Sequence, residues 1–137
     1  MKNTFETDSI LYRILRDSPV KAAISGDIYY LEDRPDDSCK EDIIINTITL
    51  TQDFLPQIGF SNINIYVPDN DIVVDGKLQR CTDRLRLKYL AGIVVNSLRE
   101  ANIKGLKIIV RWQNIFQLPY INQSFMNIRI KWNIQIN

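Results

Sequence analysis

Within residues 59–69, polar and apolar side chains alternate from Asn62 to Val67. The two sets are Ile63, Ile65 and Val67 on one side and Asn62, Asn64 and Tyr66 on the other. A period of two predicts a half-buried strand. Pro68 cannot continue a strand ladder, so we expect the strand to end there and residues 69–71 to form a turn leaving the sheet. We expect this strand in the interior of the sheet, with a long helix folded over its apolar face.

The C-terminal stretch, residues 125–137, alternates over the greatest length. Its inward-facing set is Met126, Ile128, Ile130, Trp132, Ile134 and Ile136. Residues 106–113 alternate in the same way, with Ile108, Val110 and Trp112 on one face. We expect these two strands to pair as a long hairpin across a loop at residues 114–124.

Residues 42–51 are rich in β-branched side chains and predict another strand, with Ile44, Ile48 and Leu50 on one face. Its expected partner is the strand at residues 60–67, in antiparallel orientation. A short strand is expected at residues 27–31, and the polar, aperiodic residues 32–41 after it predict a loop.

Helical spacing of apolar residues is clearest over residues 77–98. Positions three and four apart are apolar at Leu78, Cys81, Leu85, Tyr89 and Ile93, while Lys77, Arg80, Arg84 and Lys88 lie along the opposite side. Residues 8–16 predict an amphipathic helix, and Ser18-Pro19 begins a short second one that ends at Gly26. Together these patterns predict an α+β fold in one domain, residues 1–137. We expect a mixed or antiparallel sheet, the long helix on one face, an N-terminal helical pair and a C-terminal β-hairpin.

The composition is that of an ordinary globular protein, with 45% hydrophobic residues and a net charge of +1. This balance argues against charge-driven binding to nucleic acid or membranes. No apolar run approaches the roughly 20 residues that span a bilayer, and the first residues lack the apolar core of a signal peptide. We therefore expect a protein made and kept inside a cell, with Cys39 and Cys81 as reduced thiols.

The sequence offers little for catalysis. It contains no histidine, so the usual serine–histidine and cysteine–histidine pairs cannot form, and no glycine-rich phosphate loop is present. Asp69, Asp71 and Asp75 are the one candidate for binding a cation, but Val73 stands where a calcium loop would need an oxygen ligand. We interpret this segment as a turn, and Cys81, Trp112 and Trp132 as core residues. The sequence predicts no enzymatic activity, no cofactor and no metal.

Charge is separated along the chain. Residues 27–42 hold seven acidic side chains against two basic ones, and residues 77–99 hold six basic side chains against one acidic one. Most such runs are solvated surfaces. Because the two runs carry opposite signs, they also suit a contact between subunits.

The order of elements carries a resemblance to a known family. The features that carry it are the helix containing Ile10 to Leu15, the segment 20–29 leading into a strand, the Asp33-Arg34-Pro35 turn, the strands at 43–51 and 63–67, the long helix and the closing hairpin. In this order the chain resembles the tail-terminator or tail-completion proteins of tailed bacteriophages. The resemblance covers most of the chain and includes no catalytic motif.

The resemblance implies a non-enzymatic protein that forms a ring, typically of six subunits, on the end of the tail tube. Such a ring stops tube polymerisation and joins the tail to the head connector. The resemblance further implies that the protein is located in the virion tail and that the tail is assembled in the bacterial cytoplasm. Two alternatives stay open: another head-tail adaptor or baseplate component, and a metal-dependent nuclease that resembles phage junction resolvases in its Asp-rich turn.

For a ring we expect a head-to-tail contact between unlike surfaces. Acidic residues of segment 32–42 would meet the basic stripe of a neighbour, while apolar loop residues supply most of the affinity. The expected interface residues are Asp33, Asp36, Asp37, Arg80, Arg84, Lys88, Phe116 and Tyr120, with Phe54 and Leu55 as further apolar candidates.

Overall fold

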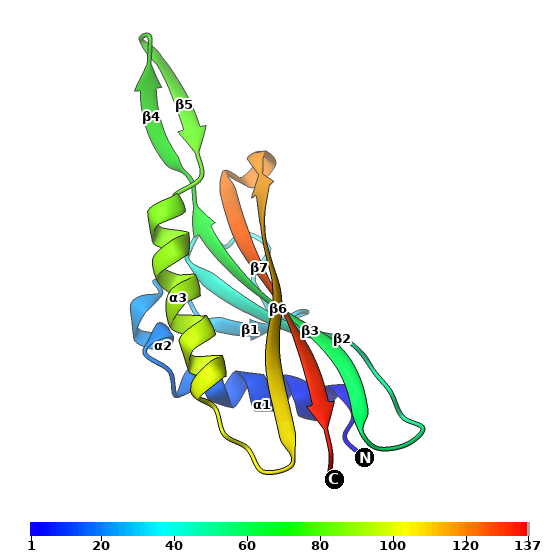
Figure 1. Cartoon of the computed structure of the whole chain (residues 1–137). Helices are drawn as coiled ribbons and strands as arrows, with labels where there is room; N and C mark the ends of the chain where they lie inside the picture. Colours follow the sequence, from blue (N-terminus) through cyan, green and yellow to red (C-terminus); the bar gives the residue numbers. More distant parts are fainter. Residues whose placement is uncertain (137) are drawn as a thin grey trace.

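A computed structural model describes residues 1–136 and shows helices packed on one face of a five-stranded sheet (Figure 1). The elements are α1 (Thr4–Arg16), α2 (Val20–Ala23), β1 (Ile28–Tyr30), β2 (Asp42–Leu50), β3 (Gln57–Pro68), β4 (Asn70–Val74), β5 (Lys77–Cys81), α3 (Arg84–Glu100), β6 (Leu106–Leu118), the 3-10 helix η1 (Pro119–Ile121) and β7 (Gln123–Ile134). The sheet order is β1-β2-β3-β7-β6. Only β1 and β2 run parallel among these neighbours, so the predicted α+β class with a mixed sheet is confirmed.

The strand β3 lies in the middle of the sheet, as the alternation predicted. Its residues alternate between buried and half-buried along the whole strand, and Ile63, Ile65 and Val67 belong to the core beneath the helices. It pairs antiparallel with β2 on one side and with β7 on the other. The strand ends at Pro68, which lacks the N–H that a ladder needs.

A chain of buried hydroxyl groups crosses the core next to Trp132. The indole Nε1 of Trp132 donates to Ser61 Oγ at 2.8 Å, and this oxygen lies 2.7 Å from Thr47 Oγ1. Thr47 Oγ1 in turn lies 2.8 Å from Thr7 Oγ1 and donates to Asp8 Oδ1 at 2.6 Å. Burial raises the pKa of Asp8, although the Thr47 hydrogen bonds oppose this shift. The chain connects β7, β3 and β2 to α1 through satisfied polar groups.

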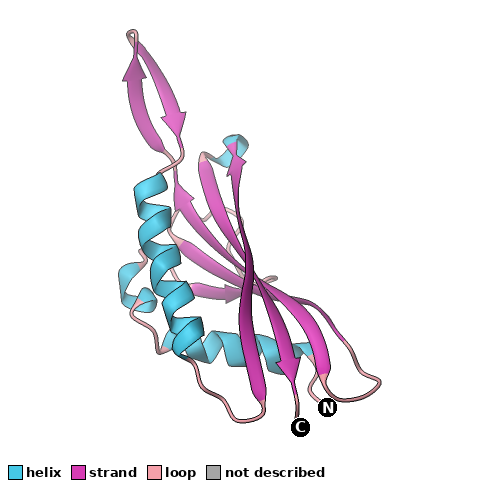
Figure 2. Ribbon diagram, viewed as in Figure 1, coloured by secondary structure: helices cyan, strands magenta, loops and turns pink. Residues whose placement is uncertain are grey.

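The predicted helix at residues 77–98 is wrong at its beginning. Residues 70–81 form a separate hairpin, β4 and β5, and α3 begins only at Arg84 (Figure 2). Val74 pairs with Lys77 across a two-residue turn in which Asp75 and Gly76 have φ of 52° and 76°. These are the positive angles of the turn type that fits the twist of a hairpin. The side chain of Asp83 caps α3 by accepting from the Arg86 N–H at 3.1 Å.

The predicted grouping of Ile44, Ile48 and Leu50 on one face of β2 is also wrong. Ile43 and Ile45 join the core, whereas Ile48 is half exposed. A shift of register between Thr47 and Thr49 then brings Leu50 back to the core. One extra residue in a strand exchanges its two faces, so alternation read straight through it gives the wrong side.

The predicted loop at residues 114–124 is mostly strand. β6 continues to Leu118, and η1 makes the turn into β7, which begins at Gln123. A shift between Val110 and Trp112 turns the Trp112 ring to the uncovered face of the sheet, where it stacks on Phe60 with ring centres 6.4 Å apart. Trp112 is therefore half exposed and not a core residue. The hairpin of β6 and β7 is confirmed; Asn137, the last residue of the predicted strand, lies outside the described residues.

Candidate assembly surface

The hairpin of β4 and β5, residues 70–81 and here called the arm, projects beyond the rest of the molecule (Figure 1). Every residue of β4 is exposed, as are the first four of β5. Its large apolar side chains, Ile72, Val73, Val74 and Leu78, all face solvent in the isolated subunit. A two-stranded hairpin is at best marginally stable in water without further packing. The arm therefore has the properties of an element that packs against another molecule.

Hydrogen bonds fix the base of the arm to the turn between β6 and β7. The Asp69 N–H donates to the Asn122 carbonyl at 2.9 Å, and Ser124 Oγ donates to Asp69 Oδ1 at 2.7 Å. On the other strand, Gln117 Nε2 donates to Thr82 Oγ1 at 3.0 Å. The direction of the arm is thus set by the main sheet.

The acidic loop, residues 31–41, is held in place by Arg34. Its Nε donates to Asp42 Oδ2 at 2.9 Å and its Nη2 to Gln123 Oε1 at 2.9 Å, and the guanidinium lies 4.2 Å above the Tyr66 ring centre. The Asp42 side chain is 1% exposed and that of Arg34 11% exposed, so the pair is buried. Asp33, Asp36 and Asp37 are left on the outside of the loop.

Aromatic rings continue from this anchor across the uncovered face of the sheet. Tyr66 stacks on Phe125 with ring centres 4.9 Å apart, and Phe125 stacks on Phe116 at 5.0 Å. Burial raises the pKa of Tyr66; the charge of Arg34 opposes this shift, and the nearby Tyr120, which is itself exposed, adds to it. The acidic loop, Phe116, Tyr120 and the base of the arm therefore gather at one end of the sheet. Phe54 and Leu55 lie at the opposite end, in the connection between β2 and β3.

The predicted basic stripe on one helix does not exist as such. Lys77 and Arg80 belong to the arm, where Arg80 Nε lies 3.4 Å from Asp71 Oδ1. Arg84 and Lys88 lie on the first turns of α3 and are exposed. Within residues 1–136, neither forms an ion pair, and the same holds for Asp33, Asp36 and Asp37. Of the charged residues predicted to form the contact between subunits, these five could therefore still pair with a neighbouring subunit.

Part of the charge counted in the sequence is neutralised inside the subunit. Glu41 meets Arg86 through two contacts, Nε to Oε2 at 2.6 Å and Nη2 to Oε1 at 2.8 Å. The hydrogen bonds from Arg86 lower the pKa of Glu41, and Glu41 raises that of Arg86. This pair ties the acidic loop to α3.

Glu41→Gln should lower the free energy of unfolding at neutral pH by about 1–3 kcal/mol, because it removes the charge from these hydrogen bonds. The pKa of Glu41 is lower in the folded protein, so the stabilisation is complete above the ordinary value of about 4.5 and is lost as the pH falls through the folded value. The difference between wild type and variant should therefore shrink in acid. Urea unfolding at a series of pH values measures it; a difference that stays constant or grows in acid would contradict the assignment.

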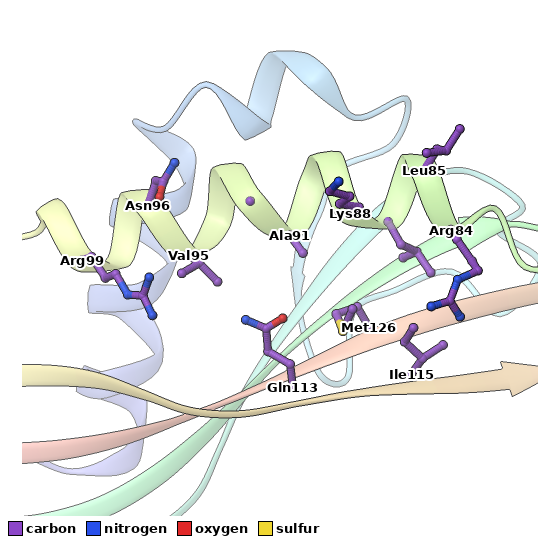
Figure 3. Close-up of a pocket in the computed structure, with 12 residues that line it drawn as sticks. Arg84, Leu85, Lys88, Ala91, Val95, Asn96, Arg99, Gln113, Ile115 and Met126 are labelled. Carbon is purple, nitrogen blue, oxygen red and sulfur yellow. The ribbon is translucent and has the colours of Figure 1, made fainter.

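A groove of about 550 Å³ runs between α3 and the outer strands of the sheet (Figure 3). Its apolar lining includes Ala91 and Val95 of α3, Ile115 of β6 and Met126 of β7. Three basic residues, Arg84, Lys88 and Arg99, border it, with Arg84 and Arg99 at its two ends. An apolar floor with a basic border suits a segment that is apolar and carries negative charge.

The three aspartates considered as a cation site are spread along the arm. Asp69 lies at its base, Asp71 pairs with Arg80, and Asp75 forms the turn at the tip. In the described part of the chain, no three Asp, Glu, Cys or His side chains are grouped so that they could hold a metal. Cys81 lies in β5, not on the helix where the sequence placed it. Within residues 1–136, every helix is too short or too polar to cross a bilayer.

Comparison with known proteins gives a match in structure alone. No protein-family model matches the sequence, and no curated protein matches it either. A chain from a solved structure described as the virion of a native gene transfer agent particle superposes with a TM-score of 0.62. The two chains are 12% identical, and the superposition covers 97% of this chain and 96% of that one. The likeness shows that the two chains share a fold over nearly their whole length.

Sequence reasoning missed the arm, although a signal for it was present. Asp75-Gly76 between Ile72-Val73-Val74 and Leu78 is a typical hairpin pattern. The groove had no comparable signal, since its two walls come from α3 and from strands that follow it in the sequence.

Proposed function

We propose that this protein is a non-enzymatic structural component of a phage-like virion, a tail-terminator or tail-completion protein that forms a ring on the end of the tail tube. The observation that carries the proposal is the likeness to a chain of a virion particle over nearly the full length of both chains. In this role the ring stops tube polymerisation and presents a surface to the head connector. The arm, with its exposed apolar side chains, supports a role in assembly.

The distribution of charge is compatible with a ring. The outer acids of the acidic loop and the bases on α3 are different surfaces of one subunit, and two unlike surfaces suit a head-to-tail contact. A head-to-tail contact closes into a ring when its rotation allows closure. Exposed ion pairs contribute only about 0–1 kcal/mol each, so the charges set the register and apolar contacts supply the affinity.

A charge reversal tests this contact. Arg84→Glu combined with Lys88→Glu should weaken association of the chain by about tenfold or more, because like charges then face each other across the interface. Adding Asp36→Lys and Asp37→Lys should restore part of the association. Sedimentation velocity at low salt measures both effects.

The matched control reverses two bases at the opposite end of the molecule, Lys104→Glu with Lys107→Glu, which changes net charge by the same amount. Both lysines are exposed. Association that falls equally in the control and in the α3 variant would show a general charge effect, and the proposed contact would then be wrong.

A further inference from the structure

We propose that the arm of one subunit packs into the groove between α3 and β6 of a neighbouring copy of the same chain. The inference deepens the assembly role proposed above and rests on it, because it names the partner of the arm. It joins two features that the isolated subunit leaves without a partner.

The arm needs an external partner for its apolar residues. Val73 is 70% exposed and Leu78 63% exposed, and within residues 1–136 the only strand pairing of the arm is between β4 and β5 themselves. The cross-strand pair of Asp71 and Arg80 is exposed and contributes little. Apolar residues that stay exposed in a monomer lower its solubility. Exposed apolar patches of this kind mark interaction sites.

The groove cannot be filled by the arm of its own subunit. None of its lining residues comes from residues 70–81. The arm leaves the body at the N-terminal end of α3 and continues away from the helix, so it points away from its own groove (Figure 1). An arm that fills the groove must therefore come from another molecule.

The dimensions and chemistry of the two features agree. Each strand of the arm, five residues long, extends roughly 17 Å. The part of α3 between Arg84 and Arg99 that borders the groove extends roughly 22 Å. The apolar side chains of the arm match the floor of Ala91, Val95 and Met126. The charged residues of the arm are Asp71, Asp75, Lys77 and Arg80; their charges cancel, so apolar contact and not charge would hold the arm in the groove.

Gly92 offers a way to close the groove without disturbing the fold. It lines the groove on α3, and a Cβ built on it meets no atom within 4 Å. Gly92→Trp should therefore fold and occupy the space that the arm needs. Gly92→Ala, which improves helix propensity and leaves the groove open, is the matched control.

Disulfide trapping tests the contact. In chains carrying Cys39→Ser and Cys81→Ser, one batch receives Val73→Cys on the arm and a second receives Asn96→Cys in the groove. Mild oxidation of the mixture should form a disulfide between the two, and this product should fall to the control level in Gly92→Trp but not in Gly92→Ala. The control batch carries Arg16→Cys, an exposed position on α1, in place of Asn96→Cys.

The inference is overturned if the Val73 and Asn96 pair reacts no more than the Arg16 control. It is overturned equally if Val73→Cys alone forms its own dimer at the same yield, because arms would then pair with arms. A chain carrying both cysteines separates this inference from the ring. Cross-linked products larger than a dimer would support both the arm-to-groove contact and the ring. Products no larger than a dimer would support the arm-to-groove contact and contradict the ring.

Discussion

Arg34→Met should lower the free energy of unfolding by about 3–5 kcal/mol, because it leaves the buried carboxylate of Asp42 without its counter-ion. Arg34 supplies one hydrogen bond to that carboxylate and one to Gln123, and it covers the ring of Tyr66. The Asp42 side chain is 1% exposed, so water does not replace the lost partner. Urea unfolding at neutral pH, followed by circular dichroism, measures the change.

A second variant separates the buried charge from the packing of the long side chain. Arg34→Met combined with Asp42→Asn removes both charges and should be more stable than Arg34→Met alone, since residues in contact are not additive. A loss below about 1 kcal/mol for Arg34→Met, the size typical of an exposed pair, would mean that Arg34 does not hold the acidic loop in place.

Trp132→Ala should also cost about 3–5 kcal/mol, because it opens a large cavity in the core and removes the donor to Ser61. The side chain is fully buried, and its Nε1 begins the chain of hydroxyl groups that ends at Asp8. Thermal and urea unfolding of the variant measure the loss.

Trp132→Phe is the comparison that isolates the polar part. It keeps an aromatic ring of smaller volume but removes the hydrogen bond, so it should lie between wild type and Trp132→Ala. If Trp132→Phe were as damaging as Trp132→Ala, the hydrogen bond to Ser61, and not the volume of the ring, would dominate at this position.

The sequence predicted the sheet interior well because Ile63, Ile65 and Val67 alternate without interruption, and so do Ile128, Ile130 and Trp132. The prediction of which face a side chain occupies failed where one extra residue in a strand shifts the alternation. The irregularities after Thr47 and after Val110 exchange the two faces of their strands, and alternation contains no sign of where such a shift occurs.

The helix predicted from residue 77 onward failed over the arm for a different reason. Leu78, Cys81 and Leu85 stand three and four residues apart, which fits a helix, although the first two lie on a strand and the third on α3. The Asp75-Gly76 turn was the stronger local signal, since both positions need positive φ.

The candidate assembly surface could be predicted only in part. The exposed positions of Asp33, Asp36 and Asp37 follow from a polar loop, and Arg84 and Lys88 follow from helical spacing. The partners of Arg34 and Arg86 lie in segments that only the fold brings together, so a count of local charge could not separate the paired residues from the available ones.

We propose that copies of this chain assemble through unlike surfaces into a closed ring. Native mass spectrometry of the chain, at high protein concentration and low salt, tests this proposal. A closed ring should give one dominant species whose mass is an integral multiple, greater than two, of the subunit mass and does not change as the concentration rises further. Species no larger than a dimer, or a distribution that keeps growing with concentration, would contradict it.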